Sequence, residues 1–512
     1  METQNKFTPQ NLDYILSLDS DRWLFHADVL VDKAHVMMLE ERDIISREQS
    51  RDILNGLIAI EQRGAAEFIE QELLAQAHAY AHDDVHTAIE SVLIRELGEG
   101  TGGRMHTGRS RNDEVATCIR IALRDDLIEL MKDVNELRSE VIAKATEHVD
   151  TVMPGYTHLQ HAQPTTLAHH LSAYSDAFAR DFTRLVTVYE RTNVSPLGAA
   201  AFASTGFPLD RAGTAKLLGF DSVMSNSMDA VSTRDFVIEA IACFANLMTN
   251  LSRLAEEIIL WSTAEFDFVR VPEDYITGSS IMPQKRNPDF AELVRSRTGT
   301  VYGCLMSALS ICKALPYAYN RDLQEVTTHL LNATKTTTAS VSVMNRIVAG
   351  LEPKKEEMEK KTMVGFTTAT ELADTIVRAT GISFRTAHKI VSSLAPVLTH
   401  NSIHELESSG GDILRRIDAL AVDVTGKKLS ELGLTEENVK EAMDVRSNIE
   451  KRDVYGGPAK EQVRKTIETR TRDLNRDENL IEAKEEGVKR SLEELERRIA
   501  ELTEMSTVKK SS

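Results

Sequence analysis

Long stretches without glycine or proline are the feature that most limits how this chain of 512 residues can fold. Neither residue occurs in 109–153, 165–195, 220–271 or 317–349. Because glycine and proline interrupt helices, such stretches permit long helices. In 236–261, apolar residues recur at helical spacing on several faces, which predicts a helix buried on more than one side. Strand-like alternation is almost absent, so we expect an all-α fold built on an elongated bundle of helices about 45–60 Å long.

The distribution of these stretches divides the chain into three expected domains. Residues 1–112 hold shorter helical segments, residues 113–365 hold the long apolar helices, and residues 366–512 hold shorter and more charged helices. Near the end, 488–502 carries apolar residues at alternating spacings of four and three, which predicts a terminal helix with an apolar stripe. The stripe fits packing on the helix's own domain, and it also fits contact with another subunit.

The charge balance excludes some classes of protein. With 60 Lys and Arg against 79 Asp and Glu, the formal net charge is −19. A nucleic-acid binder or a basic membrane-surface protein needs the opposite surface charge, whereas an anionic small substrate can still bind in a locally basic pocket. The N-terminus lacks the regions of a signal peptide, no stretch approaches the ~20 apolar residues of a membrane helix, and the cysteines lack CxxC spacing. We therefore expect a soluble cytoplasmic protein with reduced thiols.

Polar segments interrupt the apolar helices, and each has a structural and a functional interpretation. Segment 277–289, TGSSIMPQKRNPD, is predicted to be a loop because its prolines bar a continuous helix. It is either a solvated connector or a functional loop on a rigid scaffold. Segment 155–166, GYTHLQHAQPTT, holds His158 and His161. Their spacing allows a metal site, but no further ligands accompany them, so a role in acid–base chemistry fits better.

A third polar segment, HTGRSRND at 106–113, precedes a long helix. Ser110, Arg111 and Asn112 fit simple capping of that helix. They also fit the binding of an anion at its N-terminus, where Arg111 would add a bidentate contact to a carboxylate. Together the three segments suit chemistry on a small polycarboxylate, and the residues alone predict no more than that.

The same segments resemble those of a known family. TGSSIMPQKRNPD matches the GSSxMPxKxNP signature of the fumarase/aspartase superfamily. With HTGRSRND, YTHLQHAQPTT, NSMDAVSTRDF at 226–236 and YNRDLQE at 319–325, the chain resembles the argininosuccinate lyases over roughly residues 14–460. The resemblance implies a three-domain, all-α homotetramer with a core bundle of about twenty helices. It also implies that each active site takes residues from three subunits.

The resemblance further implies a reversible β-elimination of argininosuccinate to L-arginine and fumarate, without a metal or an organic cofactor. Ser279 would be the base, with Ser280 as the alternative. His158 would donate a proton to the departing nitrogen, and Glu292 would orient His158. Lys285 and backbone N–H groups of the loop could lower the pKa of the serine.

Other positions match substrate contacts of the family. Lys285 and Asn287 would hold the succinyl carboxylates. The remaining contacts implied by the resemblance are Ser17, Asp21, His86, Ser110, Arg111, Asn112, Thr157, Arg234, Tyr319 and Gln324.

The chain departs from the family pattern at two positions. Arg286 stands where many relatives have lysine, which keeps the charge. Thr327 stands where the family often has a lysine that contacts the amino-acid carboxylate of the substrate, so another cation or a water would have to replace that contact. Three alternatives stay open: an adenylosuccinate lyase, another fumarate-releasing lyase, and an inactive structural homologue of the crystallin kind. The presence of Ser279, His158, Lys285 and Glu292 counts against the last.

Overall fold

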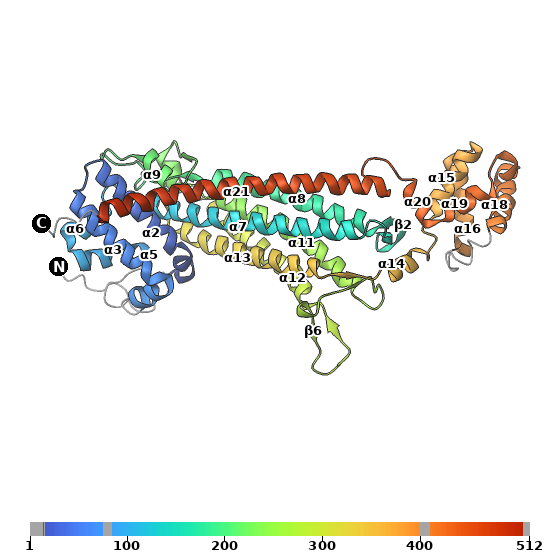
Figure 1. Ribbon diagram of the computed structural model, residues 1–512, viewed down its shortest axis with the longest axis horizontal. Coiled ribbons are helices and arrows are strands. Elements are labelled where there is room, and N and C mark those ends of the chain that lie inside the picture. The colour runs from blue at the N-terminus through green and yellow to red at the C-terminus, as the bar shows by residue number, and fades with distance from the viewer. Residues whose placement is uncertain (1–13, 15, 75–83, 399–409, 505–512) are drawn as a thin grey trace.

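The computed structural model describes residue 14 and residues 16–74, 84–398 and 410–504. The N-terminal residues on which the expectation of no signal peptide rests lie outside this part. The described part is dominated by helices that form an elongated rod, with groups of shorter helices at both ends (Figure 1). The predicted all-α class is thereby confirmed. The helices are α2 (Leu18–Glu41), α3 (Arg47–Phe68), α5 (Val85–Leu97), α6 (Glu99–Gly102), α7 (Arg111–Glu147), α8 (Leu167–Thr192), α9 (Arg211–Leu217), α10 (Ser227–Ser232), α11 (Asp235–Trp261), α12 (Asp289–Cys312), α13 (Asp322–Ala349), α14 (Lys355–Thr362), α15 (Ala369–Thr380), α16 (Phe384–Leu398), α18 (Gly410–Thr425), α19 (Glu436–Met443), α20 (Val445–Glu450) and α21 (Lys460–Glu504), with a π-helix at Ile69–Leu74 and 3-10 turns at Glu273–Tyr275 and Ser430–Leu432.

The long helices of the rod arise from the stretches that lack glycine and proline. These stretches contain α7, α8, α11 and α13. The first of them, α7, spans 37 residues and begins with a capping box, in which the Ser110 hydroxyl and the Asp113 carboxylate accept backbone N–H groups of the first turn. The predicted helix over 236–261 is α11, and its Phe244, Leu247 and Leu251 are fully buried in the main core. The core therefore runs along the rod, between these helices.

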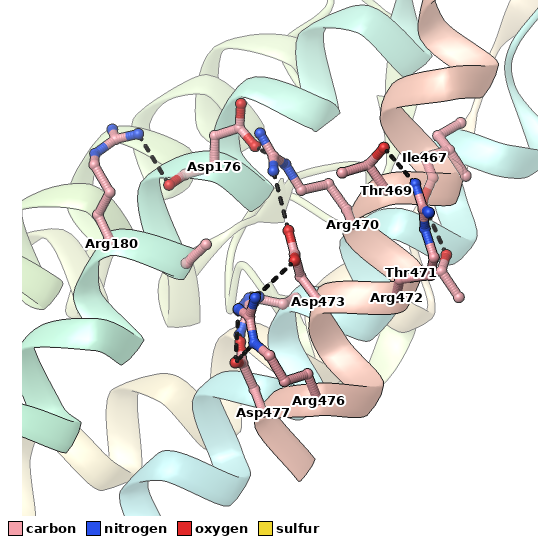
Figure 2. A network of polar contacts seen from close by, with 12 residues as sticks. Asp176, Arg180, Ile467, Thr469, Arg470, Thr471, Arg472, Asp473, Arg476 and Asp477 are labelled. Atoms are coloured by element: carbon pink, nitrogen blue, oxygen red, sulfur yellow. Dashed lines mark hydrogen bonds and ion pairs between the residues drawn. The ribbon is translucent and has the colours of Figure 1, made fainter. Parts of the chain in front are cut away.

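The last helix, α21, is longer than the sequence analysis predicted. It spans 45 residues and runs back along the rod beside α7 and α8 (Figure 1). Arg470 pairs with Asp176 of α8 (Figure 2), and the buried Arg138 of α7 donates to Asp477 Oδ2 at 2.7 Å. The expectation of only shorter helices after residue 366 is therefore wrong for this helix. Its stripe at 488–502 packs within its own chain.

A second buried core lies apart from the main one, at the end of the rod opposite the N-terminal helices (Figure 1). It is built from apolar residues of α15, α16, α18 and α19 and begins at Phe366. The division into domains at residues 112 and 365 stays a prediction. None of the described helices combines the length and the apolar character needed to cross a membrane.

The strands in the described residues are short and form two-stranded pairs. In the longest pair, β1 (Val152–Thr157) lies antiparallel to β2 (Gln160–Thr166). The others pair β3 (Val194–Ser195) with β4 (Ser222–Val223), β5 (Val269–Arg270) with β8 (Glu352–Pro353), and β6 (Thr277–Gly278) with β7 (Arg286–Asn287). Two of these pairs, β1–β2 and β6–β7, carry segments that the sequence analysis singles out as functional.

Candidate functional site

One cavity gathers many of the predicted substrate residues at the end of the rod where α2 and α5 lie. The residues come from segments far apart in the sequence, because the starts of α2, α5, α11 and α13 meet there. The predicted residues that line the cavity are Ser17, Asp21, His86, Arg234, Tyr319 and Gln324. The structure therefore brings together one group of the predicted site residues within a single chain.

Groups of opposite charge line this cavity. Burial raises the pKa of Asp21 to about 7. The nearby Asp84 adds to this rise in the pKa, whereas His86 offsets part of it. Burial alone would lower the pKa of His86, but the Asp28 carboxylate, 2.7 Å from its Nδ1, raises that pKa to about 10. His86 is therefore a cation at neutral pH, as is the buried Arg234. These two cations, the ionised Asp84 and the partly ionised Asp21 line the same cavity, so they can hold a ligand that carries both an ammonium and a carboxylate.

The start of α7 lies beside this cavity, since its Val115 is one of the lining residues, and the predicted residues 110–112 form its N-cap and first turn. Arg111 forms an ion pair with Asp84, which itself lines the cavity. On the inner side of the same turn, the fully buried Arg109 guanidinium lies 3.0 Å from the Glu114 carboxylate. Buried pairs of this kind restrict the backbone to one arrangement, so the positions of residues 110–112 are fixed.

Thr157 and His158 lie near the other end of the rod, at the turn between β1 and β2. Thr157 pairs with Gln160, so the turn itself consists of His158 and Leu159, with φ angles of 55° and 57°. Two-residue hairpins with positive φ at both positions normally use Asn-Gly or Asp-Gly, and each non-glycine residue there costs about 1–2 kcal/mol. The strained turn exposes the His158 side chain. Backbone strain of this kind is typical of functional sites.

The predicted loop 277–289 is a hairpin that projects from the side of the rod and carries β6 and β7 (Figure 1). Ser279 Oγ accepts the backbone N–H groups of Ile281 and Met282, at 3.3 and 3.1 Å. Donors at this distance would stabilise negative charge on that oxygen and so favour a basic serine. Arg286, one of the two departures from the family pattern, pairs with Glu273 and, together with Arg270, lowers the pKa of that carboxyl to about 2.

Comparison with known proteins agrees with the sequence motifs. Residues 16–303 match the lyase family, and residues 366–450 match the family described as argininosuccinate lyase C-terminal. The argininosuccinate lyase of Methanococcoides burtonii is 51% identical over 472 residues, which cover 92% of each chain. That of Methanosarcina barkeri is 50% identical over 463 residues, which cover 90% of each. The chain belongs to the argininosuccinate lyase family.

Solved structures place this argininosuccinate lyase family member in the expected superfamily fold. A structure of an EDDS lyase variant with bound fumarate superposes with a TM-score of 0.84 at 31% identity, over 98% of this chain and 97% of that chain. A class II fumarase from Schistosoma mansoni superposes with a TM-score of 0.66 at 16% identity, over 84% and 92% of the two chains, which shows a shared fold. The resemblance inferred from the motifs is confirmed.

Within one chain of this argininosuccinate lyase family member, the predicted site residues form separate groups. The cavity and the start of α7 hold one group, and the β1–β2 turn holds Thr157 and His158. The β6–β7 hairpin and the first turn of α12 hold Ser279, Lys285, Asn287 and Glu292. In the part of the chain that the structure describes, His158 and Glu292 form no hydrogen bond or ion pair with each other, so their predicted contact is not made within one chain.

Sequence reasoning misses two acidic residues, one that lines the cavity and one that contacts a lining residue. Asp84 lines the cavity and also caps α5, where its Oδ1 accepts the Thr87 N–H at 2.8 Å. Its place before a helical segment signals a cap, but a cap alone does not indicate a site. Asp28 lies in the middle of α2, behind His86, and no sequence motif marks it.

Proposed function

We propose that this chain catalyses the reversible β-elimination of argininosuccinate to L-arginine and fumarate, and that it serves arginine biosynthesis in the cytoplasm. The observation that carries the proposal is the cavity at the end of the rod, where residues of distant family motifs converge around paired charges. The named relatives at about half identity support the same substrate.

In the proposed reaction, Ser279 Oγ removes a proton from the carbon beside a succinyl carboxylate. The electron pair of that C–H bond forms the double bond of fumarate while the C–N bond breaks, and His158 gives a proton to the departing guanidinium nitrogen. The N–H groups that point at Ser279 Oγ would favour its ionised form, and Lys285 would add positive charge. Glu292 would orient His158, and general acid–base assistance of this kind contributes about 10²–10⁴-fold.

The cavity would take the amino-acid end of the substrate. Asp21 and Asp84 can accept hydrogen bonds from the α-ammonium group, whereas His86 and Arg234 can donate to the α-carboxylate. Thr327 is buried in the same wall and brings no charge. His86 and Arg234 would therefore replace the lysine contact that Thr327 removes.

A homotetramer with shared active sites is part of this proposal. Two observations support it. The predicted catalytic groups lie on separate elements of one chain, and α12 leaves apolar side chains exposed on one face, among them Tyr302, Met306 and Leu309 at 43%, 62% and 42%. An exposed apolar stripe on a long helix usually marks a protein interface.

Fumarate release, followed by ultraviolet absorbance, tests the reaction. Purified protein is offered argininosuccinate and adenylosuccinate separately, without added metal, and we expect release from argininosuccinate alone. Release from adenylosuccinate alone would support the proposed elimination chemistry but contradict the proposed binding of the amino-acid end in the cavity. Release from neither substrate by a folded tetramer would favour the structural homologue or a lyase with another substrate.

A further inference from the structure

The β1–β2 turn is braced from one side by a chain of hydrogen bonds that the proposed mechanism does not use. His161 faces Tyr156 across the hairpin, and Tyr156 Oη lies 3.2 Å from His161 Nε2. On its other side, His161 Nδ1 lies 3.0 Å from the backbone oxygen of Val364. A carbonyl oxygen only accepts, so Nδ1 carries a proton and donates it to Val364, while Nε2 and the Tyr156 hydroxyl form the second hydrogen bond.

The far end of this chain of bonds is a junction between the two cores. Val364 follows α14 and precedes Gly365 and Phe366, whose φ angles of 86° and 56° turn the backbone sharply. The second core begins at Phe366. A Cβ at Gly365 would lie 3.0 Å from His161 Nδ1, so the absence of a side chain there lets the ring approach the junction. His161 therefore links the hairpin to the point where the second core begins.

Aromatic packing holds the near end of the chain of bonds. Tyr156 and His161 meet edge to face with ring centroids 5.2 Å apart, and Tyr156 also packs on Phe266 at 5.5 Å. These residues line one side of a cavity of about 530 Å³ next to the turn, which means that the turn is not packed tightly from that direction. From that direction the hydrogen bonds of His161 restrain the turn, in addition to the pairing of β1 with β2 and the packing of β1 on α14.

We propose that His161 is a positioning residue, which holds the strained turn at His158 and Leu159 in place by tying the hairpin to Val364. The inference rests on the proposed function of His158 as the proton donor. Its physical basis is that a turn with positive φ at two non-glycine residues relaxes when its flanking strands are released. A shift of about 1 Å in a catalytic group can lower a rate about 10²-fold, so loosening the turn lowers the rate without removing a contact to substrate.

Site-directed variants of the full-length protein test this role. In His161→Leu we expect kcat to fall by at least about tenfold, with KM for argininosuccinate within about twofold of wild type, because the proton donor is misplaced while substrate binding is kept. His161→Asn keeps a donor near the position of Nδ1 and should recover most of kcat. Tyr156→Phe removes only one hydroxyl and should give an intermediate kcat. Gln160→Ala, at an exposed position of the same hairpin, is the matched control and should behave like wild type.

Amide hydrogen exchange gives a second readout that needs no substrate. We expect residues 156–161 to exchange faster in His161→Leu than in wild type, and Gln160→Ala to leave their exchange unchanged. Unchanged exchange in His161→Leu would overturn the proposal, and so would an unchanged kcat. A raised KM with an unchanged kcat would make His161 a substrate contact instead. If wild type releases no fumarate from argininosuccinate, the proposed function fails, while the exchange comparison still decides whether His161 holds the turn.

Discussion

At the scale of single residues, the buried pair of Asp28 and His86 sets the charge of the cavity. Their side chains are 0% and 3% exposed, and Asp28 Oδ1 lies 2.7 Å from His86 Nδ1. Burial opposes the charged form of the imidazole. The Asp28 carboxylate outweighs this effect, with smaller contributions from Asp84 and Glu114, so the pKa of His86 rises to about 10. A cation is thus maintained in a place where an isolated histidine would be neutral.

The same pair predicts how stability depends on pH. A histidine whose pKa is about 10 when folded and about 6.5 when unfolded stabilises the protein fully below pH 6.5, and this contribution is lost as the pH rises toward 10. We therefore expect Asp28→Asn to lower the free energy of unfolding by about 3 kcal/mol or more at pH 6, and by much less at pH 9. Urea unfolding at both pH values, at one fixed protein concentration, measures the difference.

The control for this prediction is Asp19→Asn, on the same helix. Asp19 pairs with Arg22 at the surface, where the side chains are 80% and 52% exposed. Exposed pairs contribute about 0–1 kcal/mol, so this variant should change stability little at either pH. Equal losses at pH 6 and pH 9 in Asp28→Asn would mean that Asp28 acts through packing and not through the charge of His86.

The proposed roles of Ser279 and Ser280 can be separated by substitution, because two backbone N–H groups are directed at the hydroxyl oxygen of Ser279. Ser279 Oγ accepts two backbone N–H groups that would stabilise its ionised form. We expect Ser279→Ala to lower kcat by about 10²–10⁴-fold and to leave the fold and the proposed tetramer intact, since the residue lies on a projecting hairpin outside the core. Ser280→Ala should stay within a few-fold of wild type. The reverse order in a fumarate assay would assign the base to Ser280.

At the scale of elements, the ion pairs of α21 differ in burial, and the buried one joins the helix to α7 while the more exposed ones lie within α21. Asp477 pairs with Arg138, whose side chain is 1% exposed. Asp473, one turn earlier, pairs with the more exposed Arg470 and Arg476 (Figure 2). We expect Asp477→Ala to destabilise the protein by about 3–5 kcal/mol, because it leaves a buried guanidinium unpaired. Asp473→Ala should cost less than about 1 kcal/mol. Similar losses of urea stability in both variants would show that burial of the partner does not decide the cost.

The elements also show which parts of the fold could be predicted from sequence. The helices α7 and α11 follow from long apolar stretches without glycine or proline, since local signals and packing agree there. The full length of α21 does not follow, because Gly487 lies within it and its first half consists mostly of polar residues. The β1–β2 hairpin does not follow either, because its turn uses His158 and Leu159 where the usual signal is Asn-Gly.

Some residues of the candidate site could likewise be predicted from the sequence, and others could not. Residues such as Asp21, His86 and Tyr319 could be named from motifs, and the structure shows that they line one cavity. The burial of Asp28 against His86, and the contact of His161 with Val364, join positions 58 and 203 residues apart in the sequence, through tertiary packing. No local pattern encodes such a contact, so these supporting residues become visible only in the folded chain.

At the scale of the whole molecule, the separation of the predicted catalytic groups leads to the last prediction. If His158 and Ser279 of one active site come from different chains, a tetramer made of two kinds of defective subunit can still contain complete sites. His158→Asn and Ser279→Ala proteins should each be nearly inactive alone. After mixing, denaturation and reassembly at equal amounts, about one quarter of the sites should regain both native residues, if subunits combine at random in a symmetric tetramer.

Fumarate release from argininosuccinate by the reassembled mixture measures this recovery, and native mass spectrometry shows whether mixed tetramers formed. Each variant reassembled with itself is the control, and so is a protein that carries both substitutions, because none of these can form a complete site. Recovery well above the controls requires that the two side chains reach one substrate from different subunits. Mixed tetramers without recovery would mean that both residues act from the same chain. The β1–β2 turn and the β6–β7 hairpin, which lie on separate elements here, would then have to approach each other by a rearrangement within one chain.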